Sequence, residues 1–359
     1  MRVNKIKSAV LEKNQKVTVK DLPQEKLLSL ECEVKIEAAG LCSSDISRGY
    51  GGTSYFYPLV MGHEMAGEIT KIGSGVKNHF HVGDKVCVFP LIPCFNCIPC
   101  KQKLYALCKD YSYYGSRKNG GFAERLNVNH WNLLKIPDGV NIEDCALIEP
   151  TTVALHAVEK LNITNEEKSK VCILGAGFIG LIAVQIIKRL YPKCEVIITD
   201  RNQYKLNIGS NYGASTKLVN DQTSWEFFLL QNANSFDNII ELVGSPETYS
   251  AALEIASHGA TIVWAGNISE NLKLEKSQVS SILRKELTIL GTWNSIFKGK
   301  YSCDWEKAIE LIANGLKPSE LVTSRISLDE IDKTLEKLYE HKSRKSFFKS
   351  IKILVNPNG

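Results

Sequence analysis

The sequence predicts an α/β protein in which a β-rich domain precedes a doubly wound parallel sheet. Three observations support this class. Short β-rich runs extend from Val17 to about Val140, strands and helices then alternate, and a mixed tail could return to the first domain. Alternating strands and helices are typical of a parallel sheet covered by helices.

The β-rich part consists of short runs, such as residues 33–38, 68–72 and 85–89, separated by glycine and polar turns. Runs of this kind are typical of antiparallel strands joined by tight turns. We therefore expect a partly open antiparallel barrel or sandwich.

From about Leu147 the pattern changes to a helix, expected over residues 147–161, and then to strand and helix alternation. Residues 171–174 are all apolar, which favours a buried parallel strand. We expect a helix over 178–190, further strands at 195–200, 238–243, 261–265 and 287–291, and in the tail helices at 305–314 and 328–339 and a strand at 351–355. The β-rich domain should therefore comprise residues 1–158 and 297–359, and the parallel-sheet domain residues 159–296.

The composition is that of a soluble globular protein, with 44% hydrophobic residues and a formal charge of +5 spread along the chain. A basic arm, a signal region and the ~18 continuous apolar residues of a membrane span are all missing from the sequence. We expect a cytoplasmic protein that binds neither nucleic acid nor membrane. The eleven cysteines fit a reducing compartment, because several are needed as metal ligands.

Cys94, Cys97, Cys100 and Cys108 lie within one short segment, with the spacing C-x2-C-x2-C-x7-C. Thiolates this close can converge on a single zinc ion, and four sulfur ligands leave no position for substrate. Free thiols or a disulfide pair are the alternative. The spacing favours a structural zinc site.

Gly175-x-Gly177-x-x-Gly180 follows the predicted strand 171–174 and opens the predicted helix, and Asp200 ends the next strand. This context is that of the Rossmann dinucleotide fingerprint, in which the glycines admit the pyrophosphate and an acidic residue binds the ribose hydroxyls. Phe178 and Ile179 lie within the fingerprint. Asp200 favours NAD over NADP, although Arg201 beside it could serve a 2′-phosphate.

Four further segments carry a resemblance to a known family: Pro90 to Cys97, Tyr114 to Glu124, Leu147 to His156, and Ile282 to Trp293. With Gly62-His63-Glu64 and Gly40-Leu-Cys42-Ser-Ser44, they resemble the zinc-dependent medium-chain dehydrogenases from end to end. Within that family the chain is most similar to the sorbitol dehydrogenase-like branch and, there, to the galactitol-1-phosphate 5-dehydrogenases. The resemblance implies a GroES-like β-rich catalytic domain beside the Rossmann domain.

The resemblance also implies a second, catalytic zinc, and hence two zinc ions per chain. Cys42 and His63 would bind it, with Glu64 at or near the metal and Glu149 where classical alcohol dehydrogenases carry a cysteine. Which of the two glutamates ligates directly stays open. Ser44 would carry away the proton of the alcohol, and Glu149 offers another route for it.

A polyol or polyol phosphate, similar to galactitol 1-phosphate, is the substrate that the resemblance favours, oxidised to the ketose or formed from it. Arg48 and Arg117 could anchor a phosphate, because a guanidinium offers a bidentate fork; solvated surface charges are the alternative. Lys205, Val243 and Trp293 are expected to border the cofactor. A homodimer or homotetramer is expected by family likeness.

Two other functions remain open. The same fold could oxidise threonine or 2,3-butanediol, in which case the two arginines would not matter. A non-catalytic dinucleotide-binding protein is the alternative from another class, but it would have no need of an open zinc site.

Overall fold

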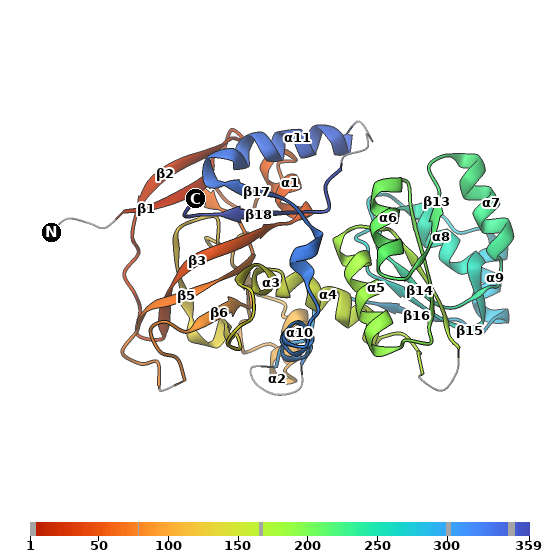
Figure 1. The fold of residues 1–359 in the computed structure, drawn as a ribbon, viewed down its shortest axis with the longest axis horizontal. Helices are drawn as coiled ribbons and strands as arrows, with labels where there is room; N and C mark the ends of the chain where they lie inside the picture. Colours follow the sequence, from red (N-terminus) through yellow and green to blue (C-terminus); the bar gives the residue numbers. More distant parts are fainter. Residues whose placement is uncertain (1–4, 78, 165–167, 299–302, 344–348) are drawn as a thin grey trace. The chain divides into compact units, whose positions relative to one another are not determined.

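The computed structural model describes residues 5–77, 79–164, 168–298, 303–343 and 349–359. The chain divides into two compact units, residues 1–150 with 296–359, and residues 151–295. Figure 1 shows the elements of both units along the chain.

The first unit is β-rich. Its largest sheet has the order β10-β6-β5-β3-β18-β17, with β9 also paired to β3; a second sheet has the order β2-β1-β4, and β7 pairs with β8. The strands are β1 (Lys5–Leu11), β2 (Val17–Pro23), β3 (Glu31–Leu41), β4 (Leu59–Val60), β5 (Glu64–Ile72), β6 (Lys85–Val88), β7 (Leu91–Ile92), β8 (Ser112–Tyr113), β9 (Arg125–Asn129), β10 (Leu133–Lys135), β17 (Val322–Ser327) and β18 (Lys352–Asn356).

Helices in this unit connect and cover the strands. They are α1 (Ser43–Tyr50), α2 (Ile98–Lys101), α3 (Ile142–Ala146), α10 (Asp304–Ala313) and α11 (Ile331–Ser343), with short 3₁₀ turns at Tyr105–Leu107, His130–Asn132, Pro318–Leu321 and Leu328–Glu330.

The tail of the chain completes the first unit. Strand β18 pairs antiparallel with β3, placing Leu354 opposite Gly40, and in Figure 1 the blue C-terminal elements lie among the red and orange N-terminal strands. Ile353 and Val355 of β18 join the same buried apolar core as Val34, Ile36 and Met65. Burial of these side chains explains why the last apolar run of the sequence forms a strand here.

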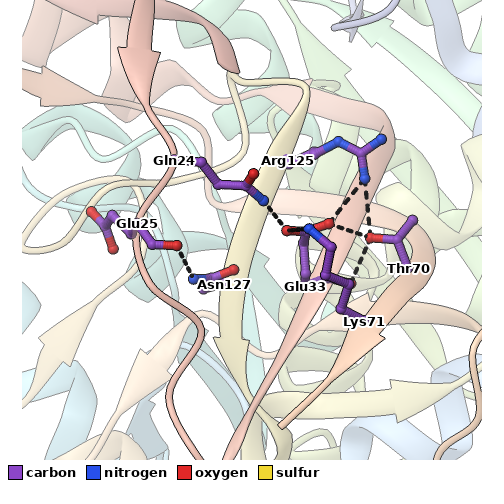
Figure 2. A network of polar contacts seen from close by, with 7 residues as sticks. All are labelled: Gln24, Glu25, Glu33, Thr70, Lys71, Arg125 and Asn127. Carbon is purple, nitrogen blue, oxygen red and sulfur yellow. Dashed lines mark hydrogen bonds and ion pairs between the residues drawn. The ribbon is translucent and has the colours of Figure 1, made fainter. Parts of the chain in front are cut away.

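A network of polar contacts joins strands of this unit at one buried carboxylate (Figure 2). Glu33 of β3 is 1% exposed. It accepts hydrogen bonds from Lys71 Nζ (2.9 Å), Thr70 Oγ1 (2.7 Å) and Arg125 Nη1 (3.0 Å), and also from the Gln24 side chain. The carboxylate therefore links β3, β5, β9 and the segment that follows β2.

The second unit contains a six-stranded sheet with the order β13-β12-β11-β14-β15-β16, in which all neighbouring strands are parallel. The predicted α/β class, with a doubly wound parallel sheet, is confirmed. Its elements are α4 (Ile148–Glu159), which begins in the first unit, β11 (Lys170–Leu174), α5 (Phe178–Leu190), β12 (Glu195–Asp200), α6 (Gln203–Asn211), β13 (Ser215–Leu218), α7 (Gln222–Asn232), β14 (Phe236–Glu241), α8 (Pro246–Ile255), β15 (Ala256–Trp264), α9 (Lys276–Arg284) and β16 (Thr288–Gly291).

The unit boundaries differ from those expected after residues 158 and 296. Helix α4 runs through the first boundary, which falls between Pro150 and Thr151. A buried hydrogen bond from Thr152 Oγ1 to Ser295 Oγ (2.7 Å) joins the two ends of the second unit. The residues from 151 onward therefore belong with the parallel sheet.

Among the described residues, no helix combines the length and the apolar character that crossing a membrane requires.

Candidate catalytic and metal centre

The four clustered cysteines lie together in the first unit, around α2. The Sγ atoms of Cys94 and Cys100 are 3.9 Å apart, and those of Cys97 and Cys108 are 3.8 Å apart. Zinc bound by four thiolates at about 2.3 Å holds its sulfur ligands about 3.8 Å from one another. The four thiols therefore fit one tetrahedral zinc ion.

Backbone amides favour negative charge on two of these sulfurs. N–H groups of Lys109 and Cys100 lower the pKa of Cys97 to about 6, and those of Asn96 and Cys97 lower the pKa of Cys94. Burial raises the pKa of Cys100 to about 12 and also raises that of Cys108. The thiolate, the form that binds metal, is therefore favoured at Cys94 and Cys97.

A second group of potential ligands lies at the start of α1 and of β5. The ligand atoms of Cys42, His63 and Glu64 lie within 4.8 Å of one another. Cys42 is the residue that caps α1, His63 and Glu64 are buried, and Glu64 is the first residue of β5. A thiolate, an imidazole and a carboxylate are the donor types of catalytic zinc sites.

Asp45 supports two members of this group. Its Oδ2 accepts a hydrogen bond from the Cys42 N–H (3.0 Å), and its Oδ1 lies 3.7 Å from His63 Nδ1. Burial opposes the charge on His63, but Asp45 and Cys42 together outweigh it and raise the pKa of His63 well above its usual value. The 3.7 Å separation is longer than a hydrogen bond, so Asp45 acts on the imidazole through its charge.

Glu149, in the first turn of α4, lies beside the group without joining it. Its Oε1 accepts a hydrogen bond from the Tyr113 hydroxyl (3.2 Å), and the Tyr113 ring packs against His63 with centroids 5.8 Å apart. Burial raises the pKa of Glu149 to about 7, with Glu64 raising it further and His63 opposing. Of the four predicted ligands of the catalytic zinc, Glu149 is thus the one that is outside the three-residue cluster.

Lys352, in β18, is a site residue that the sequence analysis missed. It is 5% exposed, and its Nζ donates a hydrogen bond to Glu64 Oε1 (2.6 Å). Gly40 of β3 leaves space for this pair, since a Cβ there would overlap the Glu64 carboxylate. A lysine inside the apolar run 351–355 was the signal in the sequence, because an unpaired lysine is almost never buried.

The two arginines proposed to bind substrate have different surroundings. Arg48 Nη1 donates to Asp45 Oδ1 (2.9 Å) and to Ser44 Oγ (3.3 Å). The guanidinium of Arg117 lies over the rings of Tyr55 (4.5 Å) and Tyr111 (4.2 Å), and its Nη1 donates to the Tyr111 carbonyl (2.9 Å). Arg48 therefore has a carboxylate in hydrogen-bond contact, whereas Arg117 contacts two aromatic rings and a backbone carbonyl and interacts with Asp110 through charge.

The glycine-rich turn of the second unit has the geometry of a dinucleotide site. Gly175 follows β11 with φ +110°, and Gly177 caps α5, whose first residues are Phe178, Ile179 and Gly180. A Cβ on Gly180 would overlap the carbonyl oxygen of Gly175. The Gly175 and Ala176 N–H groups are already bonded to the Thr199 carbonyl and to Asp200. The amino end of α5, which no side chain caps, is therefore the part that can receive an anion.

The other predicted cofactor residues lie around the carboxyl ends of the strands. Asp200 ends β12, and its Oδ2 accepts a hydrogen bond from the Ala176 N–H (2.9 Å) in the glycine-rich turn. Arg201 is exposed next to it, and Lys205 lies on α6. Val243 and Trp293 follow β14 and β16 and are 50% and 53% exposed.

Two family models match the chain. The alcohol dehydrogenase GroES-like domain matches residues 29–138, and the zinc-binding dehydrogenase domain matches residues 179–314. The predicted combination of a GroES-like domain and a Rossmann-type sheet is confirmed.

Individual proteins match most of the chain. Galactitol 1-phosphate 5-dehydrogenase of Escherichia coli K12 is 37% identical over 79% of this chain and 81% of its own length. A zinc-binding dehydrogenase of Sinorhizobium meliloti bound to NADP is 28% identical, with a TM-score of 0.87 over 98% of this chain and 99% of that one.

A third match is an Escherichia coli alcohol dehydrogenase in complex with NADH, which is 27% identical, with a TM-score of 0.87 over 99% of this chain and all of that one.

The matched domains, the similarity over most of the chain and the two clusters of ligand residues lead to one conclusion. The chain belongs to the zinc-dependent medium-chain alcohol dehydrogenase family.

Proposed function

We propose that the protein is an NAD-dependent zinc enzyme that oxidises a secondary alcohol of a polyol or polyol phosphate, similar to galactitol 1-phosphate, to the ketose, or catalyses the reverse reduction. The observation that carries this proposal is the convergence of Cys42, His63 and Glu64 in a member of an oxidoreductase family. A purely dinucleotide-binding protein would not need these three groups within reach of one ion.

Cys42 and His63 would hold the catalytic zinc, with Glu64 and Glu149 as the further candidate ligands. When bound, zinc supplies Lewis acidity that lowers the pKa of an alcohol. Asp45 fixes the Cys42 amide and faces His63, while Lys352 balances the charge of Glu64. Because Lys352 neutralises the charge of Glu64, this carboxylate would donate less electron density to zinc, and the ion would keep its Lewis acidity.

Ser44 is proposed to take the proton of the substrate hydroxyl at Oγ. Arg48 Nη1 already donates to that oxygen, so the serine's own hydrogen is left to point toward another acceptor. Arg48 cannot accept a proton, and the proton must therefore leave through water or through Glu149, whose pKa of about 7 suits an acceptor near neutral pH.

NAD is the proposed cofactor, because Asp200 places a carboxylate beside the glycine-rich turn and would repel a 2′-phosphate. The four-cysteine loop is proposed to hold the second, structural zinc. A reducing, cytoplasmic compartment is proposed, because the four thiols of this loop are needed as metal ligands. A homodimer or homotetramer is the proposed assembly.

Arg117 is the better of the two candidates for a phosphate anchor. Arg48 is compensated by Asp45 through a hydrogen-bonded ion pair, whereas the guanidinium of Arg117 lies over two aromatic rings. Tyr111 packs against Tyr113 (6.2 Å between centroids), which contacts both Glu149 and His63. A continuous row of side chains thus connects Arg117 with the proposed metal site inside one unit.

The test is NADH formation by the zinc-loaded protein on galactitol 1-phosphate, galactitol, glucitol, L-threonine and 2,3-butanediol. We expect the phosphorylated polyol to be preferred and Arg117→Ala to raise its KM about 10- to 100-fold, the loss of one charge-assisted contact. The KM for galactitol should not change.

Arg325→Ala is the matched control, since Arg325 pairs with Glu143 on an exposed surface. Equal turnover of free and phosphorylated polyols would show that Arg117 does not anchor a phosphate. Preference for threonine or butanediol would move the protein to that branch, and no turnover with any of the five would contradict the proposal.

A further inference from the structure

A buried carboxylate in the second unit fixes the turn that follows the central strand β14. Glu241 is the last residue of that strand and is fully buried. Its Oε1 accepts hydrogen bonds from the N–H groups of Val243 (2.8 Å) and Gly244 (2.9 Å) and from Thr248 Oγ1 (2.8 Å). One oxygen therefore joins both amides of the turn to the first turn of α8.

That turn lies directly against the glycine-rich turn. Val243 Cγ2 is 3.1 Å from the position that a Cβ on Gly175 would occupy, and the Leu242 N–H donates to the Leu174 carbonyl (3.0 Å). Gly175 is the first glycine of the dinucleotide fingerprint. Any shift of Val243 would change the surface against which the glycine-rich turn packs.

Glu241 also holds the turn that follows β15. Its backbone carbonyl accepts from the N–H groups of Ala265 (3.0 Å) and Gly266 (2.9 Å), and the Ser269 N–H donates to the Gly244 carbonyl (3.0 Å). A Cβ on Gly266 would lie 2.6 Å from Glu241 Oε2. The turns after β14 and β15 therefore meet at Glu241, and the turn after β14 also packs against the turn after β11.

The second oxygen of the carboxylate, Oε2, is buried and has no hydrogen-bond partner among the described residues. Trp264 Nε1 at the end of β15 and Thr292 Oγ1 just after β16 are likewise buried without a hydrogen-bond partner among the described residues. Unpartnered buried polar atoms are unfavourable and call for an explanation. All three lie at the carboxyl edge of a parallel sheet, the edge at which such sheets bind ligands.

We propose that Glu241 is a positioning residue for the dinucleotide, and that it acts by fixing the Val243–Gly244 turn against Gly175. The inference rests on the proposed function, because it requires that this edge binds NAD. A neutral acceptor of the same size is sufficient for the role, since all three side-chain hydrogen bonds end on one oxygen.

The experiment is a fluorescence titration of NADH into the full-length, zinc-loaded wild type and its Glu241→Ala, Glu241→Gln and Thr248→Val variants. We expect Glu241→Ala to raise the Kd for NADH and the KM for NAD roughly tenfold or more, the effect of a loss of about 1.4 kcal/mol. The kcat at saturating NAD and the KM for the polyol should change little. Glu241→Gln should stay close to the wild type, and Thr248→Val should lie between.

Asp237→Ala is the matched control, because Asp237 lies in the same strand near its other end and accepts a hydrogen bond from the Lys170 N–H (2.9 Å). Asp237→Ala should lower the melting temperature without changing the Kd for NADH. If the role of Glu241 were purely structural, Glu241→Ala would give this same result.

A folded Glu241→Ala variant whose Kd stays within about twofold of the wild type overturns the inference, as does a Glu241→Gln variant as weak as Glu241→Ala. If Glu241→Ala does not fold, an unchanged Kd in Thr248→Val overturns it. A wild type that binds no NADH would instead remove the proposed function, and the inference with it.

Discussion

Single residues at the proposed metal site depend on partners that are distant in sequence. Glu64 is 1% exposed, and a carboxylate this deeply buried requires a compensating charge. Lys352 supplies it from the last strand. Burial alone would lower the pKa of this lysine, but Glu64, Cys42 and Glu149 together raise it above its usual value.

Replacing Lys352 by methionine should therefore destabilise the protein strongly. Methionine keeps the apolar part of the side chain but leaves Glu64 charged and unpaired, a change that typically costs about 3–5 kcal/mol. Urea denaturation of the metal-free protein measures the difference, because bound zinc would itself compensate the charge of Glu64. Lys352→Arg should recover part of it.

Lys71→Met is a suitable control. Lys71 pairs with a buried carboxylate, Glu33, which keeps Arg125 and Thr70 as partners after the change. The control should cost less than about 1 kcal/mol. If both substitutions lowered the free energy of unfolding equally, the Lys352–Glu64 pair would contribute no more to stability than the Lys71–Glu33 pair.

The sequence predicted the donors of this site but not the residues that support them. Cys42, His63 and Glu64 lie in short motifs that carry the family resemblance, and the structure brings their ligand atoms together. The Lys352 contact joins residues 288 positions apart, and no local pattern encodes such a pairing. The different surroundings of Arg48 and Arg117 were hidden for the same reason.

Among the secondary-structure elements, those with a continuous apolar pattern were predicted best. Helix α5 and strand β12 have the predicted bounds, because an apolar face and a buried strand leave a local signal. Strand β17 was not predicted. Its sequence, Val-Thr-Ser-Arg-Ile-Ser, has few apolar residues, and it pairs in parallel with β18.

The Glu33 network makes the packing of three strands dependent on pH. Burial alone would raise the pKa of Glu33, but Lys71, Thr70 and Arg125 outweigh it and hold that pKa below its usual value. A carboxyl with a lowered folded pKa stabilises the protein fully above its unfolded pKa of about 4.3, and this contribution is lost as the pH falls.

We therefore expect Glu33→Gln to be less stable than the wild type at pH 7, by about 1–3 kcal/mol, because two cations lose a buried partner. The difference between the two proteins should shrink as the pH falls from about 5 to 3. Denaturation curves of both proteins across this range measure it. A difference that stays constant with pH would mean that the carboxylate charge does not contribute.

At the scale of the whole molecule, one chain carries two ligand clusters that we propose have separate roles. The cysteine loop offers four thiols and no open position, whereas the second cluster combines three donor types. A closed site stabilises the fold, and an open one binds substrate.

Metal analysis of variants can separate these roles. The wild type should contain two zinc ions per chain, and Cys100→Ser and His63→Ala one each. Cys100→Ser should lower the melting temperature but leave the kcat of the folded protein near that of the wild type. His63→Ala should lose activity by about 1000-fold or more, because a Lewis-acid metal contributes several kcal/mol.

Cys194→Ser controls for the loss of a thiol as such, since Cys194 is buried in the second unit, outside both clusters. It should keep two zinc ions and full activity. If Cys100→Ser abolished turnover while the protein remained folded, the cysteine loop would be more than structural. If His63→Ala kept both zinc ions, the catalytic ion would have to be held by other residues. The proposal that Ser44 takes the proton of the substrate hydroxyl would then lose its basis, because it places the zinc at Cys42 and His63.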